Sequence, residues 1–317
     1  MTFVKKFGFK KYDGEYRGMV YRVWSLMLFD MTERIWKQRS VLLAYAILCG
    51  MILVVAVPIL AVLAVIRQMW DQFGVISSVW GQSFYYEDFP VGAADVYPLF
   101  VNSFSTYFLT ILFLGVAGGK VLSQDIETKV IQNYFTRISR EEYFIGKFLA
   151  VFISYFLSLE IPFTIIYFWM CSVLKIDAFN FANLDIYLKT LIFVAYACLF
   201  YTGLTLAVSS GTARRFYATL VFVVLLTGVT IVPNIFYGMT GNEEFLIFDM
   251  LRDLRAIYMS LIGYGTISDI LNLAIIFSGY ESIINKEVAP PDALLFITGL
   301  TAILMAYALK KTILDEE

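Results

Sequence analysis

The stretch Gly118–Lys147, GGKVLSQDIETKVIQNYFTRISREEYFIGK, decides the fold because it is polar, carries both signs of charge and separates two long apolar stretches. Hydrocarbon cannot solvate such groups, since every buried polar group there needs a partner within the protein. We therefore expect this loop to lie in water while its flanks lie in a bilayer. The loop predicts a membrane protein with a structured aqueous element between two spans.

The composition points to the same class. Hydrophobic residues make up 60% of the chain and charged residues 16%, whereas soluble domains carry roughly 45–50% and 25%. The excess falls in blocks long enough to cross a bilayer, which takes about 20 apolar residues as a helix. The sequence predicts an all-α membrane protein with one membrane domain and no separate soluble domain.

Six apolar blocks within 41–309 are predicted to be transmembrane helices. They run over about 41–66, 97–118, 148–173, 187–208, 217–236 and 293–309. Residues 237–292 form a large outer loop, in which Leu246–Leu261 has helical spacing. The segment 262–280 is apolar enough for a seventh span, but its Asp269 and Asn272 favour short interfacial or re-entrant helices.

Residues 1–40 are predicted to be a cytoplasmic segment with an amphipathic helix over 19–39. Its apolar residues recur at three- and four-residue steps. They are Met19, Val20, Val23, Trp24, Met27, Met31 and Ile35. A helix lying in the membrane interface is favoured, and packing on the surface of a partner is the alternative.

The loops also predict orientation, because cytoplasmic loops of membrane proteins are enriched in lysine and arginine. With six spans, eighteen of the 24 lysines and arginines fall on the side that holds both termini and the 118–147 loop. Both ends, including the tail 310–317, are therefore expected in the cytoplasm, with the chain in the plasma membrane.

Several function classes are disfavoured by the residues that the chain contains. It has no histidine, which removes the commonest proton shuttle and metal ligand. The three cysteines lie in apolar blocks and are expected to be buried thiols. The net charge of −2 gives no basic field for nucleic acid. We expect no catalytic residues, no metal site and no cofactor in this chain.

The 118–147 loop carries its own helix signals. Ser139-Arg140-Glu141-Glu142 is a capping box, which predicts that the third span begins in water before it reaches the bilayer. Residues 125–131 fit a short helix with carboxylates near its N-terminus, a favourable position for the helix dipole. A short helix, a break at 136–138 and a capped helix would form a rigid element able to carry force into the second and third spans.

These residues resemble the type 2 ABC transporter permeases. In that family an acidic pair, a short helix, a Ser-Arg step and a Gly-Lys pair precede the third span. The chain shows Asp125, Glu127 and Thr128, then Ser139-Arg140, Tyr143 and Gly146-Lys147. Arg137 stands where the family usually has proline, and Thr128-Lys129 replaces a common Gly-Thr. The helix before the first span is similar to the family's N-terminal elbow helix.

The resemblance implies the membrane subunit of an ATP-driven transporter, an exporter, working as a dimer with a second permease copy or a paralogue among membrane lipids. The loop would dock in an ABC ATPase subunit that holds ATP and Mg. The residues implied in coupling are Asp125, Glu127, Thr128, Ser139, Arg140, Tyr143 and Lys147. Neither Gly119-Lys120 nor Gly146-Lys147 fits a phosphate-binding loop, so hydrolysis is expected in the partner.

Glu160, two residues before Pro162, lies midway along the third predicted span. An ionised, unpaired carboxylate there costs about 2.5–3.5 kcal/mol on insertion scales. Glu160 either contacts substrate or protons, or links helices through hydrogen bonds, and both interpretations stay open. An ion-coupled carrier or channel is the alternative function, although Glu160 is almost alone as a charged residue within the spans. The substrate is not indicated.

Overall fold

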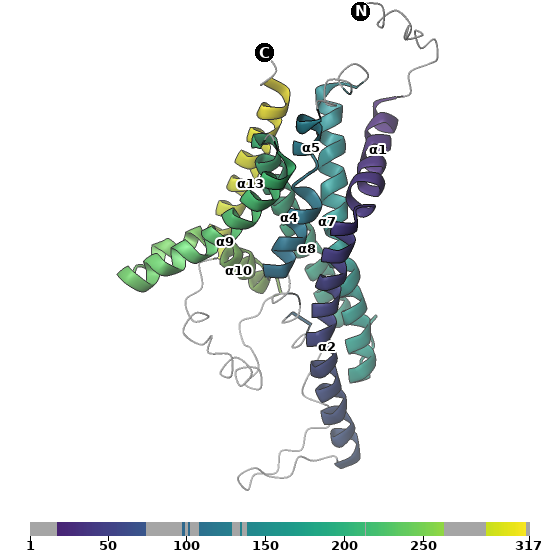
Figure 1. Cartoon of the computed structure of the whole chain (residues 1–317). Helices are drawn as coiled ribbons and strands as arrows, with labels where there is room; N and C mark the ends of the chain where they lie inside the picture. Colours follow the sequence, from purple (N-terminus) through teal and green to yellow (C-terminus); the bar gives the residue numbers. More distant parts are fainter. Residues whose placement is uncertain are drawn as a thin grey trace, which may run out of the picture.

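The computed structural model describes residues 18–73, 97, 98, 101, 108–128, 134, 138–212, 214–262 and 290–314 (Figure 1). Every secondary-structure element within these residues is helical. The predicted all-α class is therefore confirmed for the described part of the chain.

Five helices are long and apolar enough to cross a membrane. They are α2 (Arg39–Phe73), α7 (Arg140–Leu174), α8 (Phe181–Gly211), α9 (Arg215–Thr240) and α13 (Pro290–Leu314). Each contains a predicted span and extends it at one or both ends. The sixth predicted span, 97–118, is described only at 97, 98, 101 and in α4 (Phe108–Gly118), and its remainder lies outside the described residues.

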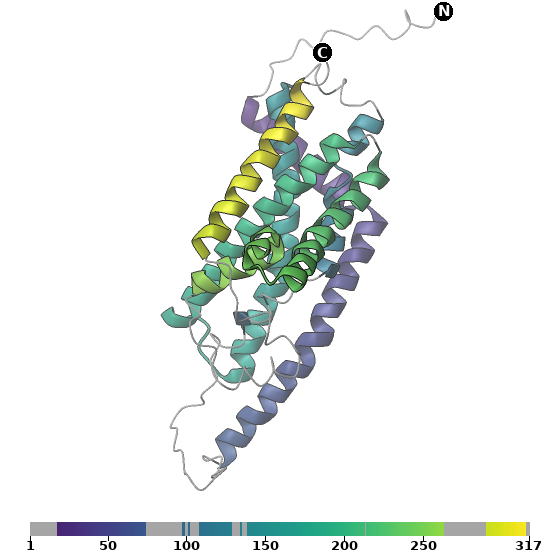
Figure 2. The same ribbon diagram turned by 90° about the vertical axis from the view of Figure 1, so that its left-hand side faces the viewer.

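Helix α8 lies at the centre of the bundle, with α7, α9, α10 and α13 packed around it (Figure 2). In the most apolar part of α8, 72% of the residues are buried, against 17% in α9. Helices α2, α9 and α13 instead expose large apolar side chains, including Val54, Val224 and Leu295. An apolar face without protein cover is the surface that lipid or a partner's helix requires.

Close approach of α4 to its neighbours depends on glycine at positions 115 and 118. A Cβ atom at Gly118 would lie 2.0 Å from the Tyr155 hydroxyl of α7. A Cβ atom at Gly115 would lie 2.9 Å from the Phe222 ring of α9. Small residues let helices pack this tightly, so α4 can contact both α7 and α9.

The N-terminal segment differs from its prediction in two ways. It is divided into α1 (Met19–Phe29) and the π-helix η1 (Asp30–Trp36), and α2 begins at Arg39. Of the seven predicted apolar-face residues, Val23, Met27 and Ile35 are buried, but Met19, Val20 and Trp24 are exposed. The buried face also contains Leu26 and Asp30, because α1 and η1 pack along α7.

The predicted helical spacing in Leu246–Leu261 is confirmed by η2 (Glu243–Phe248) and α10 (Met250–Ile262). Helix α10 packs against α8 and α13, and the Tyr258 hydroxyl lies 3.0 Å from the Thr190 hydroxyl of α8. Asp253 is fully buried there. Burial, with a smaller contribution from Asp249, raises the pKa of Asp253 to about 8. Apart from Ile262, the segment 262–280 lies outside the described residues.

Candidate functional site

The 118–147 loop contains the short helix α5, which covers Ser123–Glu127 and so begins before the predicted 125–131 helix. Within the predicted stretch, residues 129–131 lie outside the described part of the chain. The capping box is confirmed. Ser139 Oγ accepts from the Glu142 amide at 3.2 Å, and Glu142 Oε2 accepts from the Ser139 amide at 3.1 Å. Helix α7 therefore starts at Arg140, with two of the amides at its start satisfied by side chains.

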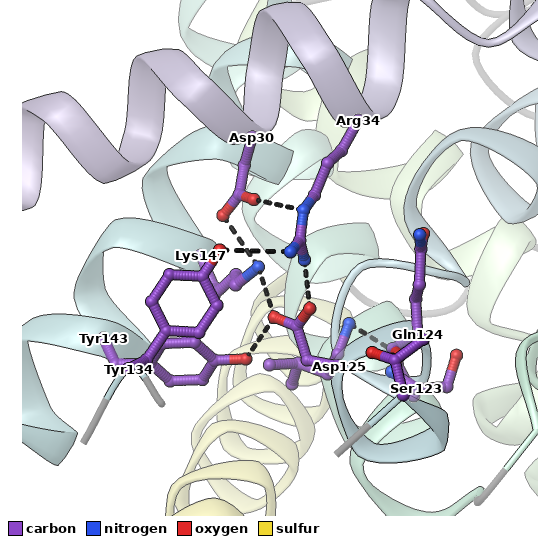
Figure 3. A network of polar contacts seen from close by, with 11 residues as sticks. Asp30, Arg34, Ser123, Gln124, Asp125, Tyr134, Tyr143 and Lys147 are labelled. Carbon is purple, nitrogen blue, oxygen red and sulfur yellow. Dashed lines mark hydrogen bonds and ion pairs between the residues drawn. The ribbon is translucent and has the colours of Figure 1, made fainter. Parts of the chain in front are cut away.

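A polar network joins this loop to the N-terminal segment (Figure 3). Lys147 of α7 lies at its centre, with its Nζ 2.8 Å from Asp30 Oδ2 and 2.7 Å from Asp125 Oδ2. All three side chains are fully buried. One ammonium group therefore holds η1, α5 and α7 together.

Arg34 completes the charge balance of the polar network. Its Nε lies 3.2 Å from Asp30 Oδ1, and its Nη1 forms an ion pair with Asp125 Oδ1. The π-helical turn brings Asp30 and Arg34, four residues apart, to the same side of η1 (Figure 3). Two carboxylates face two cations, so no net charge is buried. Such pairing is what burial of ionised groups requires.

Two tyrosines close the polar network. The Tyr143 hydroxyl donates to Asp125 Oδ2 at 2.6 Å, and the Tyr143 ring centroid lies 5.2 Å from Lys147 Nζ. Arg34 Nη2 donates to the Tyr134 hydroxyl at 3.1 Å. Both rings lie within reach of Lys147 Nζ, at 5.8 Å for Tyr134 and 5.2 Å for Tyr143, for cation–π attraction.

The two aspartates differ in acidity. Burial alone would raise the pKa of Asp125, but Lys147 and Arg34 outweigh it, and that pKa lies below its ordinary value. At Asp30 burial prevails over the same two cations, so the pKa of Asp30 is raised. Of the two aspartates, Asp125 is therefore the one that the cations hold in its ionised form, and its pair with Lys147 links α5 to α7.

Further contacts fix α1 to the start of α7. Arg22 forms a bidentate pair with Glu142, with Nη2–Oε1 at 2.5 Å and Nε–Oε2 at 3.2 Å. Hydrogen bonding to Arg22 lowers the pKa of Glu142. A Cβ atom at Gly146 would lie 2.8 Å from Leu26 Cδ2. Gly146 thus allows α1 to pack closely on α7, and Lys147 binds η1 through Asp30.

The loop is also attached to α8. The backbone amides of Leu122 and Ser123 donate to Ser209 Oγ at 3.1 and 2.9 Å. Ser209 lies near the end of α8 and is fully buried. Any displacement of α5 therefore acts on η1, α7 and α8 together.

The seven residues predicted to couple to an ATPase fall into a buried group and a more exposed group. Asp125, Tyr143 and Lys147 are fully buried, so their side chains hold the loop in place and cannot reach a partner's surface. Glu127, Thr128 and Ser139 are exposed, and Arg140 is half-buried. Ser139 is occupied as a helix cap, and the Thr128 hydroxyl donates to the Gln124 carbonyl at 2.8 Å. Glu127 and Thr128, at the end of α5, are the exposed acidic and hydroxyl side chains there.

Sequence reasoning missed Arg22, Asp30 and Arg34. A signal was present, because Asp30 falls at helical spacing from Leu26 and Met27 and therefore lies on the apolar face of its helix. A carboxylate within an apolar stripe needs a buried cation, and Arg34 follows it by one turn. Their pairing with Asp125 and Lys147 is a tertiary contact that local spacing does not indicate.

The intramembrane candidates lie far from the polar network. Glu160 lies on α7, thirteen residues and between three and four turns beyond Lys147. Helix α7 continues through Pro162 without ending there. The Glu160 side chain is buried and accepts from the Thr164 hydroxyl at 3.3 Å. The polar network and Glu160 are thus two separate polar centres on one helix.

No protein-family model and no curated protein matches the chain. Among the residues described, no three histidine, cysteine, aspartate or glutamate side chains gather where they could hold a metal ion. All three cysteines are free thiols, with Cys171 and Cys198 buried.

Proposed function

We propose that the chain is the membrane-spanning permease subunit of an ATP-driven ABC transporter, an exporter of the plasma membrane with six spans and both termini in the cytoplasm. A separate nucleotide-binding subunit would hydrolyse ATP with its Mg, and a second permease copy or a paralogue would complete the substrate path. The proposal extends the resemblance of the 118–147 loop to type 2 ABC permeases.

One observation carries the proposal: α5 is a short helix tied rigidly to three other helices while its end stays exposed. Lys147 and Arg34 hold Asp125 by ion pairs, and Ser209 accepts two amides from the start of α5. Glu127 and Thr128 are exposed at the other end. A contact made there by a moving partner would displace η1, α7 and α8 as one body.

In this proposal α1 and η1 serve as the elbow helix. They transmit force because ion pairs of Arg22 and Asp30 fix them to α7. The exposed apolar side chains of α1, Val20, Trp24 and Leu28, lie at four-residue steps on one stripe. That stripe suits the membrane interface, while the opposite stripe packs on α7.

The test is site-specific photo-crosslinking from position 127 in intact cells. A photoreactive residue replacing Glu127 should capture a protein with the phosphate-binding motif G-x-x-x-x-G-K-[ST]. The matched control replaces Glu244, an exposed glutamate of η2 predicted to lie on the outer side. The proposal fails if position 127 captures no nucleotide hydrolase, or if position 244 captures the same protein equally well.

An ion-coupled carrier is the second candidate, favoured by buried carboxylates outside the polar network. Glu160 Oε2 and both carboxylate oxygens of Asp253 have no hydrogen-bond partner in the described parts of the chain. Proton-driven uptake by the purified chain alone in liposomes, without any ATPase, would support this function. Absence of uptake without ATP and the second subunit would count against it.

A further inference from the structure

A second set of hydrogen bonds joins α4, α7 and α8, just over two turns along α7 from Lys147. The Tyr155 hydroxyl of α7 donates to the Leu114 carbonyl of α4 and lies 3.0 Å from the Thr205 hydroxyl of α8. All three residues are fully buried, and we call them the Tyr155 junction. One phenol group therefore connects three helices at a single point.

The three helices are also closely packed at the Tyr155 junction. A Cβ atom at Gly118 of α4 would lie 2.9 Å from Thr205 Cγ2, in addition to its clash with the Tyr155 hydroxyl. This spacing leaves α4 little room to shift independently of α7 and α8. Because closely packed interiors have low compressibility and transmit strain, a displacement of α7 or α8 at this point acts on α4.

Helix α8 connects the Tyr155 junction to the loop that carries α5. Thr205 lies about one turn before Ser209 and so on the same face of α8. Ser209 Oγ accepts the Leu122 and Ser123 amides, which lead into α5. The turn between α4 and α5 is therefore held at one end by the Tyr155 junction and at the other end by Ser209.

Helix α4 also packs against α2 and α9, which expose many of their apolar side chains. Phe113 of α4 contacts Tyr45 of α2, with ring centroids 5.5 Å apart. Towards α9, a Cβ atom at Gly115 would lie 2.9 Å from the Phe222 ring. A movement of α4 would therefore be passed to two helices whose apolar faces the rest of the protein leaves uncovered.

We propose that Tyr155 is a positioning residue of the transport cycle. Its hydroxyl makes α4 follow the movement of α7 and α8, so that force applied at α5 reaches α2 and α9. This role rests on the proposed function, because the force comes from ATP hydrolysis in the partner. The effect of Tyr155 on the turn between α4 and α5 belongs to the chain itself and can be measured without a partner.

Tyr155→Phe removes the hydroxyl and keeps the ring. The matched control is Tyr167→Phe, because Tyr167 is a buried tyrosine of the same helix whose hydroxyl donates to the Ala178 carbonyl at 2.8 Å. Each substitution removes a hydrogen bond from a tyrosine hydroxyl to a backbone carbonyl. A merely structural role of Tyr155 predicts that the two variants behave alike.

The first measurement is amide hydrogen exchange of the purified full chain, since exchange reports local opening of the structure. In Tyr155→Phe, the peptide that contains Leu122 and Ser123 should exchange at least fivefold faster than in wild type. Tyr167→Phe should leave that peptide unchanged. Ser209→Ala, which removes the acceptor of these amides, shows the size of the effect that a loosened turn produces.

Thr205→Val tests the same junction from α8, because it removes the other hydroxyl and nearly keeps the shape. It should also accelerate exchange of the turn, even if Tyr155→Phe fails to fold. The proposal is overturned if Ser209→Ala accelerates exchange of this peptide while Tyr155→Phe and Thr205→Val do not. Equal acceleration in Tyr155→Phe and Tyr167→Phe overturns it as well.

The second measurement uses the transporter assembled with its ATPase. Spin labels at Leu43→Cys of α2 and Leu220→Cys of α9, two exposed positions, report the distance between these helices in a Cys49→Ala background. In wild type and in Tyr167→Phe, ATP should change this distance. In Tyr155→Phe the change should fall at least twofold while ATP hydrolysis continues, and an undiminished change overturns the proposal.

The two proposals can fail separately. An assembled wild-type protein that hydrolyses ATP without any change in the distance between α2 and α9 contradicts the role of Tyr155 in transmission. Failure of the chain to assemble with any ATPase contradicts the proposed function instead. In that case the exchange experiment still decides whether Tyr155 holds the turn between α4 and α5.

Discussion

Replacing Lys147 by methionine tests whether the polar network holds the N-terminal segment, α5 and α7 together. Methionine keeps most of the side-chain volume but removes the ammonium that lies 2.8 and 2.7 Å from Asp30 and Asp125. Arg34 would then face two fully buried carboxylates alone. Breaking a buried pair by removing one partner costs about 3–5 kcal/mol, and we expect a loss of stability in that range.

The double variant Asp30→Asn/Lys147→Met restores the charge balance, because Arg34 and Asp125 remain as one pair. It should be more stable than the sum of the two single variants predicts, with a coupling free energy of about 1–3 kcal/mol. Lys37→Met is the matched control, since Lys37 pairs with Glu33 at 2.5 Å on the surface and an exposed pair contributes roughly 0–1 kcal/mol.

Unfolding can be followed with a thiol-reactive fluorophore, because Cys171 and Cys198 are buried free thiols. The measurement belongs in a Cys49→Ala background, which removes the partly exposed thiol. If Lys147→Met unfolds like Lys37→Met, or if the two substitutions in the double variant are simply additive, the network does not hold these helices together.

Four further predictions follow from described contacts. Under the proposed function, Glu127→Lys should leave the chain folded but uncouple the partner's ATP hydrolysis from transport, while Glu244→Lys should not. Equal coupling in both variants would contradict the proposed role of α5. Gly118→Ala should cost about 1–3 kcal/mol because its Cβ meets the Tyr155 hydroxyl, whereas Gly228→Ala, with open space around it, should be neutral or stabilising in the same thiol assay. Ser139→Ala should cost about 1 kcal/mol through loss of the helix cap, with a matching fall in the unfolding midpoint. Burial raises the pKa of Asp253 to about 8, so the stability that its protonated form provides is lost as the pH rises through about 8. Raising the pH from 7 to 9 should therefore lower the free energy of unfolding by about 1 kcal/mol. An Asp253→Asn protein with the same pH dependence of stability would refute this.

The lengths of the apolar blocks predict the long helices well, because the thickness of the bilayer sets how many apolar residues a spanning helix needs. The capped start of α7 at Ser139 was also predictable, since a capping box is a local pattern whose hydrogen bonds connect residues three apart. The predicted face of the 19–39 helix was partly wrong because both sides of α1 are apolar, one against α7 and the other exposed. Periodicity reports that a stripe is apolar but does not tell which neighbour covers it.

The candidate site was predictable only in part for a related reason. Asp125, Tyr143 and Lys147 were singled out from their pattern in the sequence. Their burial, however, depends on Asp30 and Arg34, and Arg34 lies 91 positions before Asp125 in the chain. Contacts of that separation depend on the packing of whole helices. The sequence therefore located the loop, and the structure separated its internal supports from its exposed end.

The contacts between α1, η1 and α7 have a consequence for biosynthesis. Arg22 meets Glu142 across 120 positions of chain, which ribosomes synthesise in roughly 6–24 s at about 5–20 residues per second. Until Asp125 and Lys147 have been made, Asp30 and Arg34 lack these two partners and keep only their pairing with each other, four residues apart. Helix α1 therefore takes its final place only after the start of α7 has been made.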